Sequence, residues 1–133
     1  MLQAPSFSPR PDAEALRDDA WIVPLLLLRR HNVDHVVIGD AAAAAYGERP
    51  PGPVGLTVVP ASYGRNLDRL AEARKAIAEQ GAAVEIEHRP DGTDGYHDLH
   101  DDARPVRIGD VEVLVASSED LARIRAAATP RVA

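Results

Sequence analysis

The apolar residues of the chain fall into short blocks that predict strands. Two valine-rich blocks, Val33–Ile38 and Gly55–Val59, stand on either side of a run of alanines. Because the first block ends in three consecutive apolar residues, it predicts a central strand that is buried on both faces. A third block, Ala83–Glu87, alternates apolar and acidic residues, which is typical of a half-buried strand. Residues Val106–Val115 predict a hairpin with Gly109-Asp110 as its turn.

Other apolar residues are spaced as in helices. Helical patterning runs through Asp12–Arg30, and Pro24 predicts a break in it, with Pro24–Arg30 as a short and mostly buried helix. The successive alanines of Ala41–Tyr46 predict a helix that packs closely on its neighbours. In this interpretation Gly39 permits a tight turn, and Asp40 caps the helix.

The clearest amphipathic helix is predicted at Asn66–Gln80. Its predicted apolar face consists of Leu67, Leu70, Ala71, Ile77 and Ala78. The last helix is predicted to begin at Ser117, which fits a capping box with Asp120. The polar stretch Arg89–Arg104 carries one proline and two glycines and is predicted to be mainly loop.

Together these elements predict a single α/β (α+β) domain, a mixed β-sheet with packed helices. A chain of 133 residues is long enough to bury one core. The domain is expected to span residues 12–128. Residues 1–11 are expected to be a flexible leader, because their prolines and serines offer no periodic apolar face, and residues 129–133 a frayed tail.

Composition narrows the classes of function. The formal net charge of −6 argues against general nucleic-acid binding, because such binding rests on clustered Lys and Arg. The chain has no cysteine, which excludes disulfides and thiolate metal sites. The longest strongly apolar stretch, Ala20–Leu28, is far shorter than the roughly 20 residues that cross a bilayer, and residues 1–11 hold no apolar signal core. We therefore expect a cytoplasmic protein without membrane contact.

Four sequence pieces occur in an order that is similar to a known superfamily. They are HNVDHVVIGDAAAAAYG, VVPAS followed by NLDRLAEA, GTDGYHDL, and VEVLVASSEDLARIR. With the order of helix, strand, glycine turn, short helix, strand, long helix and strand, they resemble the minimal nucleotidyltransferases with a polymerase-β-like fold. The resemblance covers Leu25–Ala128 and is nearest to bacterial nucleotidyltransferase-like proteins, some of which belong to toxin–antitoxin pairs. It implies a nucleotidyltransferase-like fold.

The resemblance also implies where catalytic residues would stand. In active members, a glycine turn approaches the triphosphate of the nucleotide, and here that turn is Gly39-Asp40, with an acid in place of a second small residue. The Asp-x-Asp pair of the next strand falls on Val54 and Leu56, and the third carboxylate falls on Glu85. Two Mg²⁺ ions need anionic oxygen ligands, yet Gly52–Val59 contains no Asp or Glu.

The missing pair predicts a catalytically degenerate protein that works by binding. Its partner would be a protein, a second copy of the chain or a nucleotide, and no cofactor is expected. The alternative is an active nucleotidyltransferase with a rearranged Mg²⁺ site, in which Glu85 acts with Asp40 or Glu48. No catalytic residue is expected under the leading hypothesis, in which Val54, Leu56 and Glu85 are vestigial positions.

Each candidate also has a purely structural interpretation. Gly39-Asp40 can be a plain turn with an Asp cap, and Glu85 can share a solvent-facing strand surface with Glu87. The apolar stretch Trp21–Leu28 can pack on the sheet, or stay partly exposed and support a dimer.

A third hypothesis is a small metal-binding protein. His97 and His100 are spaced to share one face of a helix, within the one local cluster of possible ligands, His97–Asp102. Catalytic zinc usually needs three protein ligands, however, and the surrounding stretch is rich in glycine. A solvated loop is therefore the preferred interpretation of this cluster, and no bound metal is expected.

Overall fold

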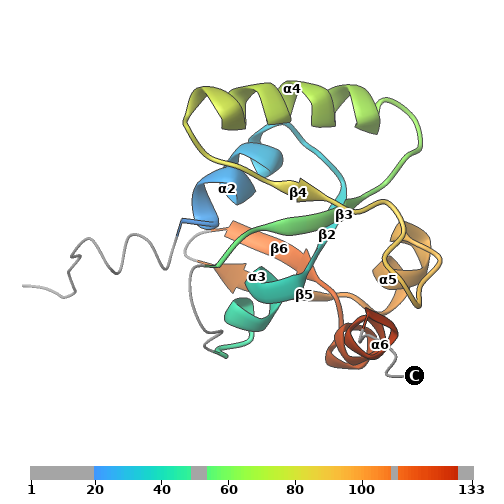
Figure 1. The fold of residues 1–133 in the computed structure, drawn as a ribbon. Coiled ribbons are helices and arrows are strands. Elements are labelled where there is room, and N and C mark those ends of the chain that lie inside the picture. The colour runs from blue at the N-terminus through green and yellow to red at the C-terminus, as the bar shows by residue number, and fades with distance from the viewer. Residues whose placement is uncertain (1–19, 49–53, 109–110, 129–133) are drawn as a thin grey trace, which may run out of the picture.

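The computed structural model describes residues 20–48, 54–108 and 111–128, which form an α+β fold around a five-stranded mixed sheet. The strands lie in the order β4-β3-β2-β6-β5, as Figure 1 shows. Their bounds are β2 His35–Ile38, β3 Thr57–Pro60, β4 Glu85–Ile86, β5 Arg104–Ile108 and β6 Val111–Val115. The helices are α2 Ile22–Arg30, α3 Gly39–Ala45, α4 Asn66–Glu79, α5 Tyr96–Asp102 and α6 Ser118–Ala128. The predicted mixed sheet with packed helices is confirmed.

Strand β2 is central and buried along its whole length, as its apolar run predicts. It pairs antiparallel with β3 in a register that sets Ile38 opposite Thr57. On its other side it pairs in parallel with β6 at Val37 and Val115. Strand β4 extends the sheet in parallel beside β3, and β5 and β6 form the predicted antiparallel hairpin. The predicted turn of that hairpin, Gly109-Asp110, lies outside the described residues.

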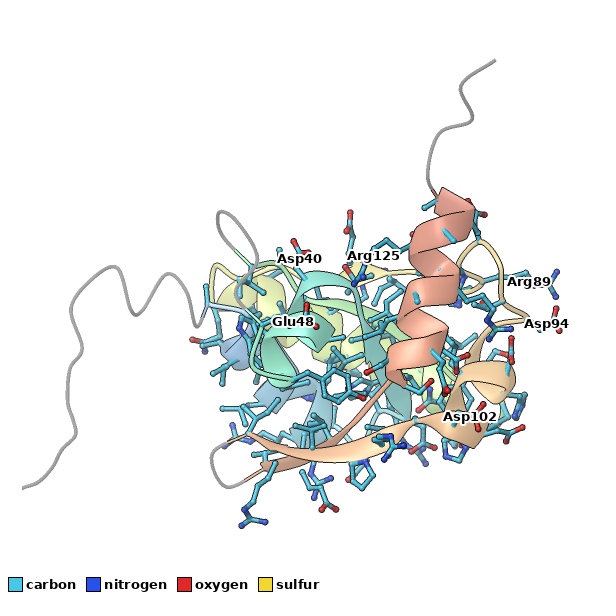
Figure 2. All side chains as sticks on the ribbon, turned by 90° about the horizontal axis from the view of Figure 1, so that it is seen from below. Asp40, Glu48, Arg89, Asp94, Asp102 and Arg125 are labelled. Carbon is cyan, nitrogen blue, oxygen red and sulfur yellow. The ribbon has the colours of Figure 1, made fainter. Side chains whose placement is uncertain are left out.

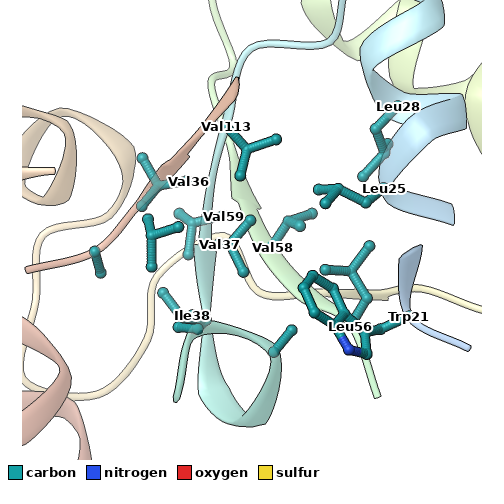
Figure 3. Close-up of a cluster of buried hydrophobic side chains, with 14 of the residues drawn as sticks. Trp21, Leu25, Leu28, Val36, Val37, Ile38, Leu56, Val58, Val59 and Val113 are labelled. Carbon is teal, nitrogen blue, oxygen red and sulfur yellow. The ribbon is translucent and has the colours of Figure 1, made fainter. Parts of the chain in front are cut away.

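The hydrophobic core fills the space between the sheet and its helices. Helices α2 and α4 cover one face of the sheet, and α3 and α6 lie on the other side, with α5 at one end (Figure 1). Figure 3 shows Leu25 and Leu28 of α2 pointing toward Val58 and Val113 of the sheet. Both leucines are completely buried. Aliphatic side chains therefore form nearly all of this core.

Helix α4 ends within a residue of its predicted end, but its predicted buried face is partly wrong. Leu70 and Ile77 are buried as predicted, whereas Asn66 and Ala73 fill the other two inward positions. The predicted residues that are exposed instead are Leu67, Ala71 and Ala78. A prediction that uses only apolar residues places the buried face at the wrong angle around the helix, because the fully buried Asn66 is polar and is not counted.

Helix α5 occupies a segment that was predicted to be loop. Its N-cap, Gly95, has φ +95°, and a Cβ at this position would lie 2.8 Å from the carbonyl oxygen of His88. The carboxylate of Asp98 accepts a hydrogen bond from the backbone N–H of Asp94 at 2.9 Å. The helix is anchored by Leu99, which is fully buried. The loop prediction is therefore wrong for Tyr96–Asp102, where the burial of Leu99 stabilises a helix that the polar local sequence does not indicate.

Several predicted boundaries also move. The strand predicted at Gly55–Val59 begins at Thr57, and the strand predicted at Ala83–Glu87 shortens to two residues. Helix α2 begins before Pro24, so this proline lies in the first turn of the helix. Backbone N–H groups in the first turn have no acceptor within the helix, so a proline there costs no helical hydrogen bond. The leader at 1–11, residues 12–19 and the tail at 129–133 lie outside the described residues.

The start of α6 confirms half of the predicted capping box. The Ser117 hydroxyl oxygen accepts a hydrogen bond from the backbone N–H of Asp120 at 3.0 Å. The carboxylate of Asp120 accepts instead from Arg123, at 2.9 Å. Within residues 20–48, 54–108 and 111–128, no helix is long and apolar enough to cross a membrane.

Two neighbouring leucines of α2 test this packing. Leu25→Ala should lower the free energy of unfolding by about 2–5 kcal/mol, because it leaves a cavity in the core. Leu26→Ala is the matched control, since Leu26 is 41% exposed, and should cost less than about 1 kcal/mol. Urea denaturation followed by circular dichroism measures both. Similar losses in the two variants would contradict the orientation of α2.

Candidate functional site

The carboxyl end of β2 keeps the glycine turn singled out in the sequence. Gly39 has φ +72°, and a Cβ at this position would lie 3.7 Å from the Cβ and Oγ1 of Thr57. Glu85 reaches the same place from β4, where its Oε1 accepts a hydrogen bond from Thr57 Oγ1 at 3.4 Å. The structure therefore brings together Gly39, Thr57 and Glu85 at one end of the sheet.

Asp40 does not cap α3. The helix begins at Gly39, its N-cap is Ile38, and no side chain forms a capping hydrogen bond. The prediction is wrong because the helix starts before the alanine run that indicated it. Asp40 instead lies exposed in the first turn of the helix, where the helix dipole favours a negative charge.

The two positions assigned to the Asp-x-Asp pair do not converge with Glu85. Leu56 is 3% exposed and lies beside Trp21 in the core, as Figure 3 shows. Thr57 and Glu85 are register partners, so their side chains lie on the same face of the sheet. Leu56 precedes Thr57 in an extended chain and points to the opposite face. Val54 is partly buried against the same core as Leu56.

Other acidic residues are spread over the surface. Figure 2 shows Asp40 and Glu48 around α3, whereas Asp94 and Asp102 lie on the other side of α6. Within the described part of the chain, no three His, Cys, Asp or Glu side chains lie close enough together to hold a metal ion. A set of three carboxylates around Glu85 is therefore not preformed among these residues.

The two histidines of α5 belong to an aromatic cluster. Each packs against the ring of Tyr96, with centroid distances of 5.6 Å for His97 and 5.2 Å for His100. Tyr63 joins this cluster, 6.0 Å from Tyr96 and 5.9 Å from His97. No third metal ligand accompanies the histidines among the residues described. The geometry favours ring packing over the metal-binding hypothesis.

A polar cleft at the amino end of β2 was not predicted from the sequence. Among the described residues, strands β2 and β6 pair at one position, Val37 with Val115. Beside the amino ends of these two strands lies a cleft of about 190 Å³. We call it the β2–β6 cleft, and its lining includes Arg29, Asp34, His35, Tyr96, Glu112 and Val113.

One wall of the β2–β6 cleft is fixed by the buried amide of Asn66. Its Oδ1 accepts a hydrogen bond from the backbone N–H of Asp34 at 2.7 Å. Its Nδ2 donates to the carbonyl oxygens of Asp34, at 3.0 Å, and Ala61, at 2.6 Å. The carboxylate of Asp34 in turn accepts a hydrogen bond from the Tyr63 hydroxyl at 2.8 Å. Asp34 is therefore held through both its backbone and its side chain.

His35 lines the β2–β6 cleft with one ring nitrogen unpaired. Its Nδ1 lies 2.9 Å from the carbonyl oxygen of Val33. Because a carbonyl only accepts, Nδ1 carries the hydrogen, and Nε2 of the neutral ring is an acceptor. Nε2 is buried and has no hydrogen-bond partner among the described residues. Burial lowers the pKa of His35, against the Val33 carbonyl and the Asp34 charge, which raise it, while the Arg29 charge lowers it further.

Tyr96 connects the β2–β6 cleft with the aromatic cluster. Burial raises its pKa, and the neighbouring Tyr63 and Asp34 raise it further. The phenol therefore remains protonated at neutral pH and can both donate and accept a hydrogen bond. The lining of the cleft thus includes one arginine, two acidic residues, a histidine and a tyrosine, and the unpaired ring nitrogen of the histidine has almost no accessible surface.

Comparison with protein-family models, with curated proteins and with solved structures gave no match. Function is therefore inferred from the residues themselves. One signal for the cleft was available in the sequence, namely a histidine directly before the Val-Val-Ile run of a buried strand. Nothing in the sequence places Arg29 or Glu112 beside it.

The buried neutral His35 predicts a loss of stability at mildly acidic pH. Its pKa in the folded protein lies below the ordinary value of 6.5. As the pH falls below about 6.5, the unfolded chain binds a proton that the folded chain excludes, so the free energy of unfolding decreases. Urea denaturation between pH 7.5 and pH 5 should show this decrease in the wild type and a flatter profile in His35→Gln. His97→Gln, at an exposed position of α5, is the control and should keep the wild-type profile.

An unchanged slope in His35→Gln would show that His35 does not carry this dependence.

Proposed function

We propose that this chain is a nucleotidyltransferase-like protein that has lost two-metal catalysis and acts by binding. One observation carries the proposal: Gly52–Val59 has no Asp or Glu where the resemblance expects an Asp-x-Asp pair. Leu56, at the second of those positions, is part of the hydrophobic core. Because this position helps to hold the fold together, a carboxylate there would be buried without a counter-charge.

The α+β architecture is compatible with the resemblance. The order of elements agrees with it from α2 to β4, and a glycine with positive φ stands at the turn after β2. Nucleotide binding at Gly39 and Asp40 remains part of the proposal. It would involve the backbone of this turn rather than a carboxylate-bound metal ion, since Glu85 is the one acid at the family's three carboxylate positions.

The surface of α2 supports a protein partner as the bound molecule. Val23 and Leu26 are 45% and 41% exposed. They line an open groove of about 640 Å³, together with Arg29, Arg30 and Val111. Exposed apolar residues with basic neighbours are suited to an apolar and acidic partner surface. A place in a toxin–antitoxin pair, or pairing with a second copy of the chain, agrees with this feature.

Transfer of a radiolabel tests the loss of chemistry. The purified protein is incubated with radiolabelled nucleoside triphosphates, Mg²⁺ or Mn²⁺, and cell lysate as a source of acceptors. We expect no label transfer above the level of Glu85→Ala, because one carboxylate cannot organise two metal ions. Label transfer that disappears in Glu85→Ala and persists in Glu87→Ala would overturn the proposal. That result would support an active site rearranged around Glu85, with Asp40 or Glu48 as the second ligand.

A further inference from the structure

We propose that the exposed face of α2 pairs with the same face of a second copy of the chain, in an antiparallel and symmetric homodimer. The inference rests on the proposed function for the role of this surface, and it names the partner. Three observations carry it. Helix α2 is apolar on every side, its exposed residues are spaced symmetrically along the helix, and the two ends of the surface carry opposite charge.

Helix α2 has no polar residue before its last two positions. Residues Ile22–Leu28 are all apolar, and Arg29 and Arg30 follow them. A helix with one side in water normally has polar residues on that side, as α4 does with the exposed Asp68 and Lys75. A helix that is apolar all round is normally covered on every side. We therefore expect a second surface to cover the outer side of α2.

The exposed residues of α2 form one stripe. Val23, Leu26, Leu27 and Arg30 follow the spacing i, i+3, i+4 and i+7, which places them on one face of the helix. Val23 and Leu26 are 45% and 41% exposed, and Leu27 is partly exposed. This spacing is symmetric about the middle of the stripe, so two copies can pack antiparallel with the same contacts on both sides. Arg30 of one copy then lies over Val23 of the other.

The apolar surface continues beyond the helix. The open groove along α2 is bordered by Gln80 after α4 and by Val111 of β6. A second hollow, lined in part by Trp21 and Leu56, shares Val23 and Gln80 with this groove. Helix α2 has nine residues, a length of about 14 Å. An interface centred on so short a helix is at the small end of the range for specific complexes, so a dimer of micromolar affinity is expected.

The two ends of this surface carry opposite charge. Arg29 and Arg30 lie in the last turn of α2. The end of α4 lies beside the first turn of α2, since Gln80 lines both hollows together with Val23. That end is the negative pole of the α4 dipole and carries the exposed Glu79, and the last turn of this fully described helix has no basic residue. Antiparallel pairing brings Arg30 of each copy to this negative end of the other.

A twofold axis satisfies both contacts with a single surface. In an isologous interface the same patch meets itself, so the patch must be complementary to itself. The α2 surface meets this condition, because its centre is apolar and its two ends carry unlike charges. Antiparallel pairing also places the opposite poles of the two α2 dipoles side by side. We therefore choose a second copy over an unrelated protein.

Sedimentation equilibrium of the full chain tests the state of association. Over a range of about 1–500 μM protein, we expect a reversible equilibrium between monomer and dimer. A monomer throughout this range would overturn the proposal, and would leave the α2 surface to another protein or to residues 1–19 of the same chain. Growth into larger assemblies would also overturn it, because a twofold interface closes at the dimer.

Two exposed leucines provide matched variants. Leu26→Gln should weaken the dimer at least tenfold, because each substitution acts twice in a symmetric interface. Leu67→Gln is the control and should leave the dissociation constant unchanged. Leu67 is 42% exposed but lies in the first turn of α4, about 20 Å along the helix from Gln80. Both variants should keep the wild-type urea midpoint when diluted below the dissociation constant. Equal weakening by the two substitutions would overturn the proposal.

Two arginines test the pairing of charges. Arg30→Glu should weaken the dimer at least tenfold, since a negative side chain then meets the negative end of the partner's α4. Arg65→Glu changes the net charge equally, but its position is the N-cap of α4, at the far end of that helix, and it should have little effect. Equal effects would show repulsion between whole chains instead of local pairing, and would overturn the antiparallel arrangement.

The lack of cysteine allows a direct test of the geometry. Because the chain has no Cys, the thiol of Leu26→Cys can form a disulfide only with a second copy. Leu26 lies near the expected twofold axis, where a residue meets its own counterpart, and a disulfide needs Cα atoms about 4.4–6.8 Å apart. Mild oxidation should produce covalent dimers of Leu26→Cys at least tenfold faster than those of Leu67→Cys. Similar rates would overturn the proposal.

The outcomes separate this inference from the proposed loss of catalysis. A monomeric protein that transfers no label would overturn the dimer alone. Label transfer that depends on Glu85 in a protein that dimerises through α2 would overturn the loss of catalysis alone.

Discussion

The buried side-chain amide of Asn66 connects the two central strands, β2 and β3, to helix α4. Asn66 is the first residue of α4, and its side chain bonds both backbone groups of Asp34 and the carbonyl of Ala61. It therefore joins the start of β2, the end of β3 and the start of α4. Without it, the backbone N–H of Asp34 and the carbonyl of Ala61 would lose this partner, at about 1–3 kcal/mol for each that stays buried, whereas the carbonyl of Asp34 also accepts from the backbone N–H of Ala61 at 3.0 Å. The same contact orients α4 and positions Asp34 beside the β2–β6 cleft.

Strand β2 then determines where chemistry is possible. All four of its residues are buried, so its side chains serve packing along almost the whole length of the strand. Polar groups gather instead at its two ends. Gly39, Thr57 and Glu85 meet at the carboxyl end, and Arg29, Asp34 and His35 gather at the amino end.

Much of the fold was predictable, because its signals are local. The run of apolar residues in β2, the helical spacing through α4 and the hairpin of β5 and β6 are all short-range patterns, and each predicts the element found. Helix α5 was missed because its stability comes from distant contacts, such as the burial of Leu99 and the salt bridge from Arg123 of α6 to Asp98. Asn66 was missed because a buried amide has no apolar signature.

The sites were less predictable than the fold. The sequence shows that Gly52–Val59 lacks acidic residues. It does not show that Leu56 and Glu85 point to opposite faces of the sheet. Arg29 and Glu112 are 83 residues apart in the chain, so no spacing rule brings them together. His35 was visible in the sequence. The acceptor role of its Nε2, however, follows from the hydrogen bond that Nδ1 makes to Val33 in the folded chain. The chemical roles of these side chains depend on which residues the fold brings next to them.

The central claim is that the carboxyl end of β2 no longer organises catalytic metal ions. The most direct measurement is paramagnetic broadening of backbone amide signals in ¹⁵N-labelled protein by Mn²⁺ without nucleotide, because a triphosphate bound at the Gly39 turn would itself carry Mn²⁺ to this place. Because one carboxylate is a weak site for a divalent ion, the account predicts no broadening that is concentrated at Gly39, Thr57 and Glu85. Selective loss of these three signals at substoichiometric Mn²⁺, abolished by Glu85→Ala, would contradict it.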